Sequence, residues 1–286
     1  MLGYVCVYVD DFLIAGETAA IRAVSDMLES TWTCSVQSLI SPVHPGSIKY
    51  LSLSIQARAD GYYVHQQEYL EELLAKWGLD RGNGVGTIVI DPLPEEPADG
   101  NEEEAVDIGQ VRLAQRMSGG LLWLSSRRGP DVAFAVSRLA SAAAINPEWA
   151  LKLGKKILRY LAGTRHYGLA YLCSGGLALH VYADASFEPA TAQTGIAVYL
   201  GHRLVDWRSC KQPQPARSTA EAEVTGLALG GVVLEGVEAV LGSMLIKAES
   251  PEMFGDNQAS IHIFKGQGSW RTRCFANRAA APQGQN

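Results

Sequence analysis

The chain has 286 residues, of which 47% are hydrophobic and 19% are charged, a composition typical of soluble globular protein. This length is enough for two domains, each with its own hydrophobic core. The five cysteines are scattered without a Cys-x-x-Cys pair, which excludes a zinc module of that kind and a disulfide framework. A reducing, intracellular setting fits this pattern best.

The formal net charge of −6 hides an uneven distribution of charge. Residues 1–110 carry 18 acids and 5 bases, whereas residues 111–286 carry 12 acids and 19 bases. The C-terminal part can therefore present a basic surface that tracks phosphates. The acidic excess peaks in the proline-containing residues 91–107, which we interpret as a solvated linker and a domain boundary.

Two apolar runs at the N-terminus, rich in Val, Tyr, Phe and Ile, surround the adjacent acids Asp10 and Asp11. The pattern predicts a β-hairpin with the acids at its tip, because neighbouring carboxylates repel each other and favour a solvated turn or a nearby cation. An ordinary acidic turn is the alternative interpretation.

Helical spacing follows in residues 18–32, and two strand-like runs follow in residues 49–57 and 62–65 with a turn at Asp60-Gly61. Residues 67–77 then predict an amphipathic helix that ends at Gly78. After the linker, three further helices are expected at residues 112–126, 130–144 and 148–161.

The last of these helices carries basic residues at spacings of three and four, which place them on one face: Lys152, Lys155, Lys156 and Arg159. A solvated face and a strip that contacts phosphates are both consistent with this pattern.

Three strands are predicted at residues 177–182, 195–200 and 203–208, followed by a long helix that begins at Ser218 or Thr219. Five glycines interrupt this helix, so it depends on packing and is expected to bend or break. A fourth strand at 252–255 and a short helix at 257–264 complete the pattern. Residues 226–246 are apolar but contain two glutamates, which argues for a protein core rather than a membrane span, and the N-terminus lacks the basic residues of a signal peptide.

Several segments resemble, in chain order, the Pol polyproteins of copia-type retrotransposons. They are Tyr8-Val9-Asp10-Asp11 and residues 61–70, 130–137, 157–164, 181–187, 207–212, 218–223 and 256–259. The resemblance implies a fold of mixed α+β or α/β class. Residues 1–90 would form a partial reverse transcriptase palm and thumb, 91–107 the acidic linker and 108–173 a helical connection. Residues 174–286 would form a ribonuclease H-like mixed sheet of the five-stranded type with helices, truncated at its C-terminus, with a disordered tail at about 279–286.

The resemblance also assigns functional residues. Asp10 and Asp11 match polymerase carboxylates, with Asp10 as a metal ligand, but only seven residues precede Tyr8 and the family's earlier aspartate is missing. Asp184, Glu223 and Asp256 match the ribonuclease H acids, which hold two Mg²⁺ ions, with Mn²⁺ as the alternative. Those ions activate a water and stabilise the leaving oxygen in phosphodiester cleavage. Glu221 points about 200° away from Glu223 on a helix, and the family match selects Glu223.

The expected partners are an RNA–DNA hybrid or another nucleic acid and the remainder of the polyprotein, with no membrane. The side chains expected to hold the nucleic acid are Lys152, Lys155, Lys156, Arg159 and Arg165. Two departures from the family stand out. Ser52 occupies a position that is glycine in relatives, and Ala276 occupies the position of the fourth ribonuclease H acid, with no Asp or Glu anywhere in residues 257–286.

Two main hypotheses follow. The chain either cleaves RNA in an RNA–DNA hybrid with an incomplete polymerase site beside it, or it is an inactive retroelement remnant that binds nucleic acid or merely folds. An unrelated metal-dependent nuclease of the same fold is a third possibility, which requires the Tyr8–Gly16 match to be accidental.

Overall fold

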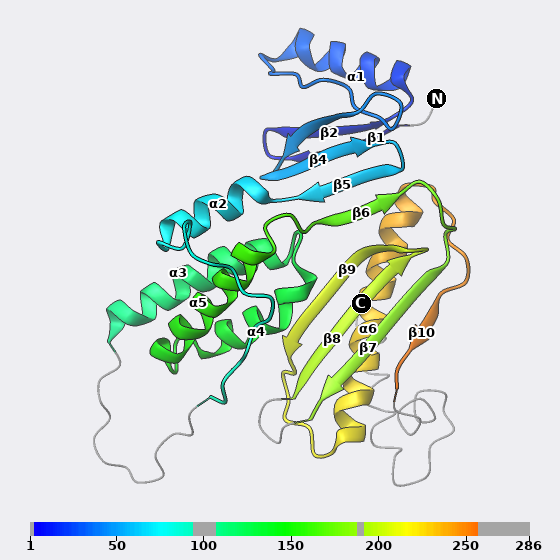
Figure 1. Ribbon diagram of the computed structural model, residues 1–286. Helices are drawn as coiled ribbons and strands as arrows, with labels where there is room; N and C mark the ends of the chain where they lie inside the picture. The colour runs from blue at the N-terminus through cyan, green and yellow to red at the C-terminus, as the bar shows by residue number, and fades with distance from the viewer. Residues whose placement is uncertain (1–2, 94–106, 188–191, 257–286) are drawn as a thin grey trace, which may run out of the picture.

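A computed structural model describes residues 3–93, 107–187 and 192–256 of the chain (Figure 1). Within these residues the strands form three separate sheets, and a group of helices lies below the second sheet and beside the third in Figure 1. The third sheet carries one long helix on its far side in this view, so the region is a mixed α+β structure, as predicted.

The first sheet is the predicted hairpin of β1 (Gly3–Tyr8) and β2 (Asp11–Gly16). Tyr8 pairs with Asp11, so Val9 and Asp10 form the turn and the acids stand at the tip. Val9 has a φ of 53°, a left-handed conformation that is strained for a β-branched residue. The helix that follows, α1 (Thr18–Thr31), confirms the predicted helical spacing.

The second sheet has the strand order β3-β4-β5-β6, with β3 at Gly46–Tyr50, β4 at Leu53–Arg58, β5 at Gly61–His65 and β6 at Leu169–Leu172. The predicted single strand at 49–57 was wrong, because the chain reverses at Leu51 and Ser52. Both residues have left-handed φ values, 50° and 62°, which is the backbone of a two-residue type I′ hairpin turn. A glycine at position 52 would adopt this conformation without strain.

Replacing Ser52 with glycine is therefore expected to raise the free energy of unfolding by about 1 kcal/mol, since a left-handed conformation costs a residue with a Cβ about that much. Chemical denaturation of the Ser52→Gly variant measures this change. The matched control is Ser47→Gly within β3, where glycine should lower stability instead. Equal effects at the two positions would contradict the turn.

The helices that lie between β5 and β6 in the chain form one continuous hydrophobic core. They are α2 (Gln67–Lys76), α3 (Ile108–Ser125), the 3₁₀ turn η1 (Pro130–Val132), α4 (Ala133–Ala142) and α5 (Pro147–Gly163). Leu70 and Leu74 of α2 belong to the same buried cluster as Met117 and Leu158. Residues on both sides of segment 94–106 therefore share one core, although the sequence suggested a boundary there.

The third sheet has the order β10-β7-β8-β9, formed by β7 (Leu179–Ser186), β8 (Gln193–Leu200), β9 (Arg203–Lys211) and β10 (Glu252–Phe254). The first three strands are antiparallel neighbours, and β10 returns parallel to β7. This arrangement matches the predicted elements. The short helix predicted at 257–264 and the tail at 279–286 lie outside the described residues.

The helix α6 (Thr219–Ser243) covers one face of this sheet and runs unbroken for 25 residues, contrary to the expected bend or break. Two of its glycines explain why. A Cβ added at Gly226 or Gly230 would lie 3.4 Å from the Ala185 Cβ or 3.3 Å from the Ala183 Cβ, so these glycines let the helix approach β7 closely. Among the described helices, α6 alone has the length and composition to cross a membrane, but it packs against β7 and β8 like a core helix.

Candidate metal centre

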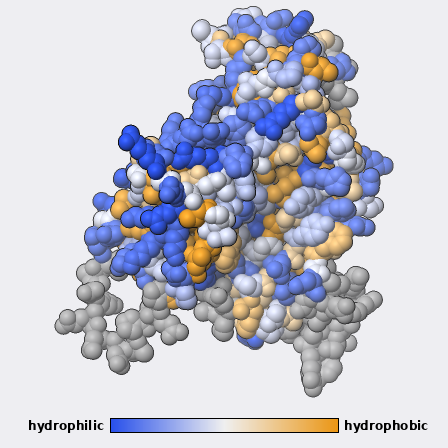
Figure 2. Space-filling view, in the orientation of Figure 1, coloured by the Kyte–Doolittle hydropathy of each residue, from blue (hydrophilic) through white to orange (hydrophobic). Residues whose placement is uncertain are grey.

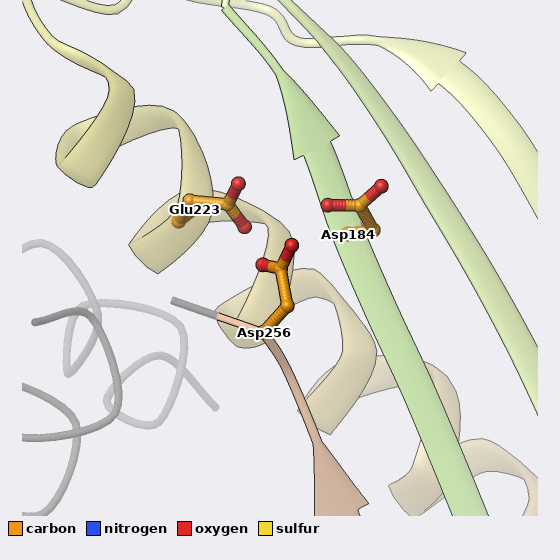
Figure 3. A group of neighbouring side chains, drawn as sticks. All are labelled: Asp184, Glu223 and Asp256. Carbon is orange, nitrogen blue, oxygen red and sulfur yellow. The ribbon is translucent and has the colours of Figure 1, made fainter. Parts of the chain in front are cut away.

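Three carboxylates from three separate elements meet at one edge of the third sheet (Figure 3). Asp184 lies on β7, Glu223 lies in the second turn of α6, and Asp256 lies two residues after the end of β10. The parallel pairing of Phe254 with Tyr182 brings Asp256 level with Asp184. One oxygen of each carboxylate lies within 4.8 Å of the corresponding oxygens of the other two. The acids singled out from the sequence are thus brought together.

The N-terminus of α6 fixes which glutamate faces the group. Ser218 is the N-cap and its Oγ accepts a hydrogen bond from the Glu221 amide at 3.2 Å, while the Glu221 carboxylate accepts one from the Arg217 amide at 2.8 Å. This reciprocal arrangement is close to a capping box. Glu221 therefore serves the helix terminus, and Glu223 points toward the other two acids, as Figure 3 shows.

A buried glutamine that sequence reasoning did not single out holds α6 against the sheet. The Gln212 side-chain amide donates to Thr194 Oγ1 on β8 at 2.9 Å and to the carbonyl oxygen of Ala222 at 2.8 Å. Ala222 immediately precedes Glu223, so this bridge fixes the backbone that carries the Glu223 side chain. Satisfied buried networks of this kind restrict local geometry.

Replacing Gln212 with methionine, which keeps the side-chain volume, is expected to weaken divalent-ion binding about tenfold, because partners that orient metal ligands typically matter by that much. A titration followed by the metal-dependent rise in unfolding temperature measures it. The matched control is Gln193→Met, which removes another buried glutamine whose amide donates to Ser137 and Ser209 and not to α6. If both variants lose affinity equally, Gln212 has no special positioning role.

The charges of the three acids act on one another. Burial, followed by the negative charges of Asp184 and Asp256, raises the pKa of Glu223 from 4.5 to about 7, although a hydrogen bond from the Ala185 amide opposes the rise. The same amide donates to the Asp184 carboxylate at 2.9 Å. A cluster of this kind is self-repelling without a cation, and a bound divalent ion would remove the penalty.

The polymerase-like acids are arranged differently. Asp10 and Asp11 are exposed at the β1–β2 turn and border a cavity of about 830 Å³ that α1 and β3 also line. In the part of the chain that the structure describes, no group of three or more potential metal ligands includes either residue. Among the described residues, two neighbouring carboxylates lie here, and the one three-carboxylate group lies at the third sheet.

Of the five predicted nucleic-acid-binding residues, three contact other parts of the chain and two are exposed on α5. Lys152 pairs with Glu148 at 2.7 Å, Lys156 pairs with Asp91 at 2.7 Å, and Arg165 donates to the carbonyl oxygen of Asp80. Lys155 and Arg159 are exposed on α5. The exposed pair is thus the better placed to contact phosphates.

A groove of about 860 Å³ begins at the acids and continues across the open face of the third sheet. Tyr182 and Phe254 line it, and each precedes one of the acids by two residues in the sequence. Sequence reasoning missed these aromatic residues. Side chains two apart on a strand share a face, so the spacing was a signal that could have identified them.

Comparison with known proteins finds relatives among retrotransposon polyproteins. No protein-family model matches the chain. It is 28% identical over 267 residues to a retrovirus-related Pol polyprotein from transposon RE1 of Arabidopsis thaliana, and 28% identical over 266 residues to one from transposon RE2 of the same plant. Each match covers 91% of this chain, but the chain spans only 17% of the length of either relative. Among solved structures, a foamy viral protease-reverse transcriptase in complex with an RNA/DNA hybrid is 12% identical, with a TM-score of 0.46; the match covers 98% of this chain and 34% of that one.

Proposed function

We propose that the chain, which is similar to retrotransposon Pol polyproteins over 91% of its length, hydrolyses the RNA strand of RNA–DNA hybrids at the group formed by Asp184, Glu223 and Asp256. The proposal assigns to this segment one activity of a much longer polyprotein.

The observation that carries the proposal is the convergence of three carboxylates from β7, α6 and the end of β10 within 4.8 Å. An all-oxygen ligand set suits Mg²⁺, which keeps several waters and takes substrate phosphate oxygens into its shell. The residues present fit such ions, because burial and the negative charges of Asp184 and Asp256 raise the pKa of Glu223, and a divalent ion would offset both effects. Mn²⁺ would occupy the same set of oxygens.

Each residue has a distinct task in this proposal. Asp184 and Asp256 would hold the ions from the open side, and Glu223 would close the site from the helix after losing its proton. Ser218, Glu221 and Gln212 keep the first turns of α6 in place. Ions bound there would supply an activated water and stabilise the leaving oxygen of the scissile phosphodiester. Selection of a hybrid would come from contacts to 2′-hydroxyls and to the backbone rather than to base edges.

The test is cleavage of an RNA strand labelled at one end, presented in a hybrid, in double-stranded RNA and as a single strand. We expect Mg²⁺-dependent cleavage of the hybrid, no cleavage with a chelator, and little cleavage of double-stranded RNA. Cleavage that persists in excess chelator would exclude this mechanism.

The pKa of Glu223 gives a prediction for metal-free protein. A carboxyl whose pKa is raised from 4.5 to about 7 in the folded state binds an extra proton between these values. Its favourable contribution to stability is complete below the lower value and is lost as the pH rises through the upper one. The unfolding temperature in chelator should therefore fall from about pH 5 to about pH 8, and Glu223→Gln should flatten the fall. Added Mg²⁺ should stabilise the protein more at the higher pH, since it competes with that proton.

A second candidate is a protein that binds hybrids without cutting them, which the alanine at position 276 favours because the family has a fourth acid there. Binding of a hybrid that weakens steeply with salt, with no cleavage in Mg²⁺ or Mn²⁺, would support this candidate over the first.

A further inference from the structure

The groove beside the acids is organised by the strand register of the third sheet. One level across the sheet reads Phe254, Tyr182, Ala197 and Trp207 from β10 to β9. On the next level toward the edge, Asp184 pairs with Gly195, which pairs with Ser209, and Asp256 lies beyond them. Aromatic residues therefore lie two residues along the strands, roughly 7 Å, from the carboxylates and on the same face.

The small residues Gly195 and Ala197 make the floor, and aromatic side chains stand on both sides of it. Phe254 stacks on Tyr182 with ring centroids 4.9 Å apart and planes 15° apart, and Tyr199 meets Tyr182 edge-on. Trp207 and Phe134 of α4 line the opposite side. The groove lies on the face of the sheet opposite α6, which is turned to the viewer in Figure 2.

These aromatic rings are accessible as well as ordered. Tyr182 is 46% exposed, Phe254 39% and Phe134 48%, in a groove whose volume is within the range of small-ligand sites. Trp207 is held in place, because its indole N–H donates to the carbonyl oxygen of Ser125 at 2.8 Å. Flat, fixed, exposed rings beside a small-residue floor are the surface on which single-stranded bases stack.

We propose that this groove holds one unpaired nucleotide next to the scissile phosphate, with its base stacked on the Tyr182–Phe254 pair and its phosphate directed toward the carboxylates. The inference rests on the proposed function and names its substrate: RNA in a hybrid that has an unpaired nucleotide beside the cleaved bond, such as the junction between a hybrid and a single-stranded end.

The binding test uses a short single-stranded RNA that contains 2-aminopurine, in Ca²⁺, so that it does not require cleavage. Stacking should quench the fluorescence, and Tyr182→Ala should weaken binding about 5- to 150-fold and remove the quenching, since one stacked base contributes about 1–3 kcal/mol. Tyr182→Phe should restore both. The matched control is Tyr167→Ala, at a tyrosine that is 47% exposed and does not line the groove.

The outcomes separate this inference from the proposed function. Quenching that depends on Tyr182, without any cleavage of hybrid, would support the groove and overturn the proposed hydrolysis. Cleavage with no quenching, or with equal binding by wild type and Tyr182→Ala, would overturn the groove.

Discussion

Asp184→Asn is expected to have two effects of opposite sign. In chelator at about pH 8 the variant should unfold at a higher temperature than wild type, because removing one of three clustered charges relieves repulsion and lowers the pKa of Glu223. With Mn²⁺ or Mg²⁺ the order should reverse, since loss of a ligand should weaken ion binding by at least about 100-fold. Unfolding temperature measured across a metal titration detects both effects.

Asp206→Asn is the matched control for that experiment. Asp206 lies on β9 of the same sheet, contacts Arg208 at 3.5 Å and is not part of the three-carboxylate group. Its variant should respond to metal like wild type. If Asp184→Asn keeps the metal-dependent stabilisation, the convergence of the three acids has no role in holding ions.

The close contact of α6 with β7 gives the largest expected change in stability. A Cβ at Gly230 would already lie 3.3 Å from the Ala183 Cβ and 3.5 Å from Val181 Cγ1, so the further atoms of leucine have no room. Gly230→Leu should lower the free energy of unfolding by about 1–3 kcal/mol or more through overpacking. It should also weaken metal binding, because moving α6 outward separates Glu223 from Asp184.

Gly236→Leu provides the same chemical change on the same helix without the contact. A Cβ at Gly236 meets nothing within 4 Å, so leucine there should raise stability by about 0.5–1 kcal/mol through helix propensity alone. Denaturation in urea distinguishes the two variants. A similar loss at both positions would mean that α6 tolerates no large residue anywhere, and that close packing at Gly230 is not the cause.

The sequence singled out the three acids that the structure brings together, because each lies in a local motif and the motifs keep their order along the chain. Nearby residues alone indicated a strand at β7, a helix start at Ser218 or Thr219 and a further strand at β10. Local patterns also predicted α2, α3, α4 and α5 to within a few residues.

What local patterns could not supply depends on pairing between distant residues. The strand β6 has four residues and was not predicted, since its partner β5 lies more than 100 residues earlier and supplies the hydrogen bonds. The turn at Leu51-Ser52 was missed because neither residue has the preference of glycine or asparagine for left-handed φ. The groove also required the cross-strand register that aligns Tyr182 with Ala197 and Trp207.

The glycines of α6 show how packing overrides propensity. Read along the sequence, five glycines in one helix predict a bend or a break. In the fold, two of them are the points of closest approach to β7, and the contact stabilises the helix that they weaken as isolated residues.

The most direct test of the account is the cleavage of an end-labelled RNA strand in an RNA–DNA hybrid by the wild-type chain and by Asp184→Asn, side by side in Mg²⁺. We expect wild type to produce shortened RNA at a rate that depends on Mg²⁺ and the variant to produce none above the rate without protein. Equal rates for the two proteins, or no cleavage by wild type in Mg²⁺ or Mn²⁺, would contradict it.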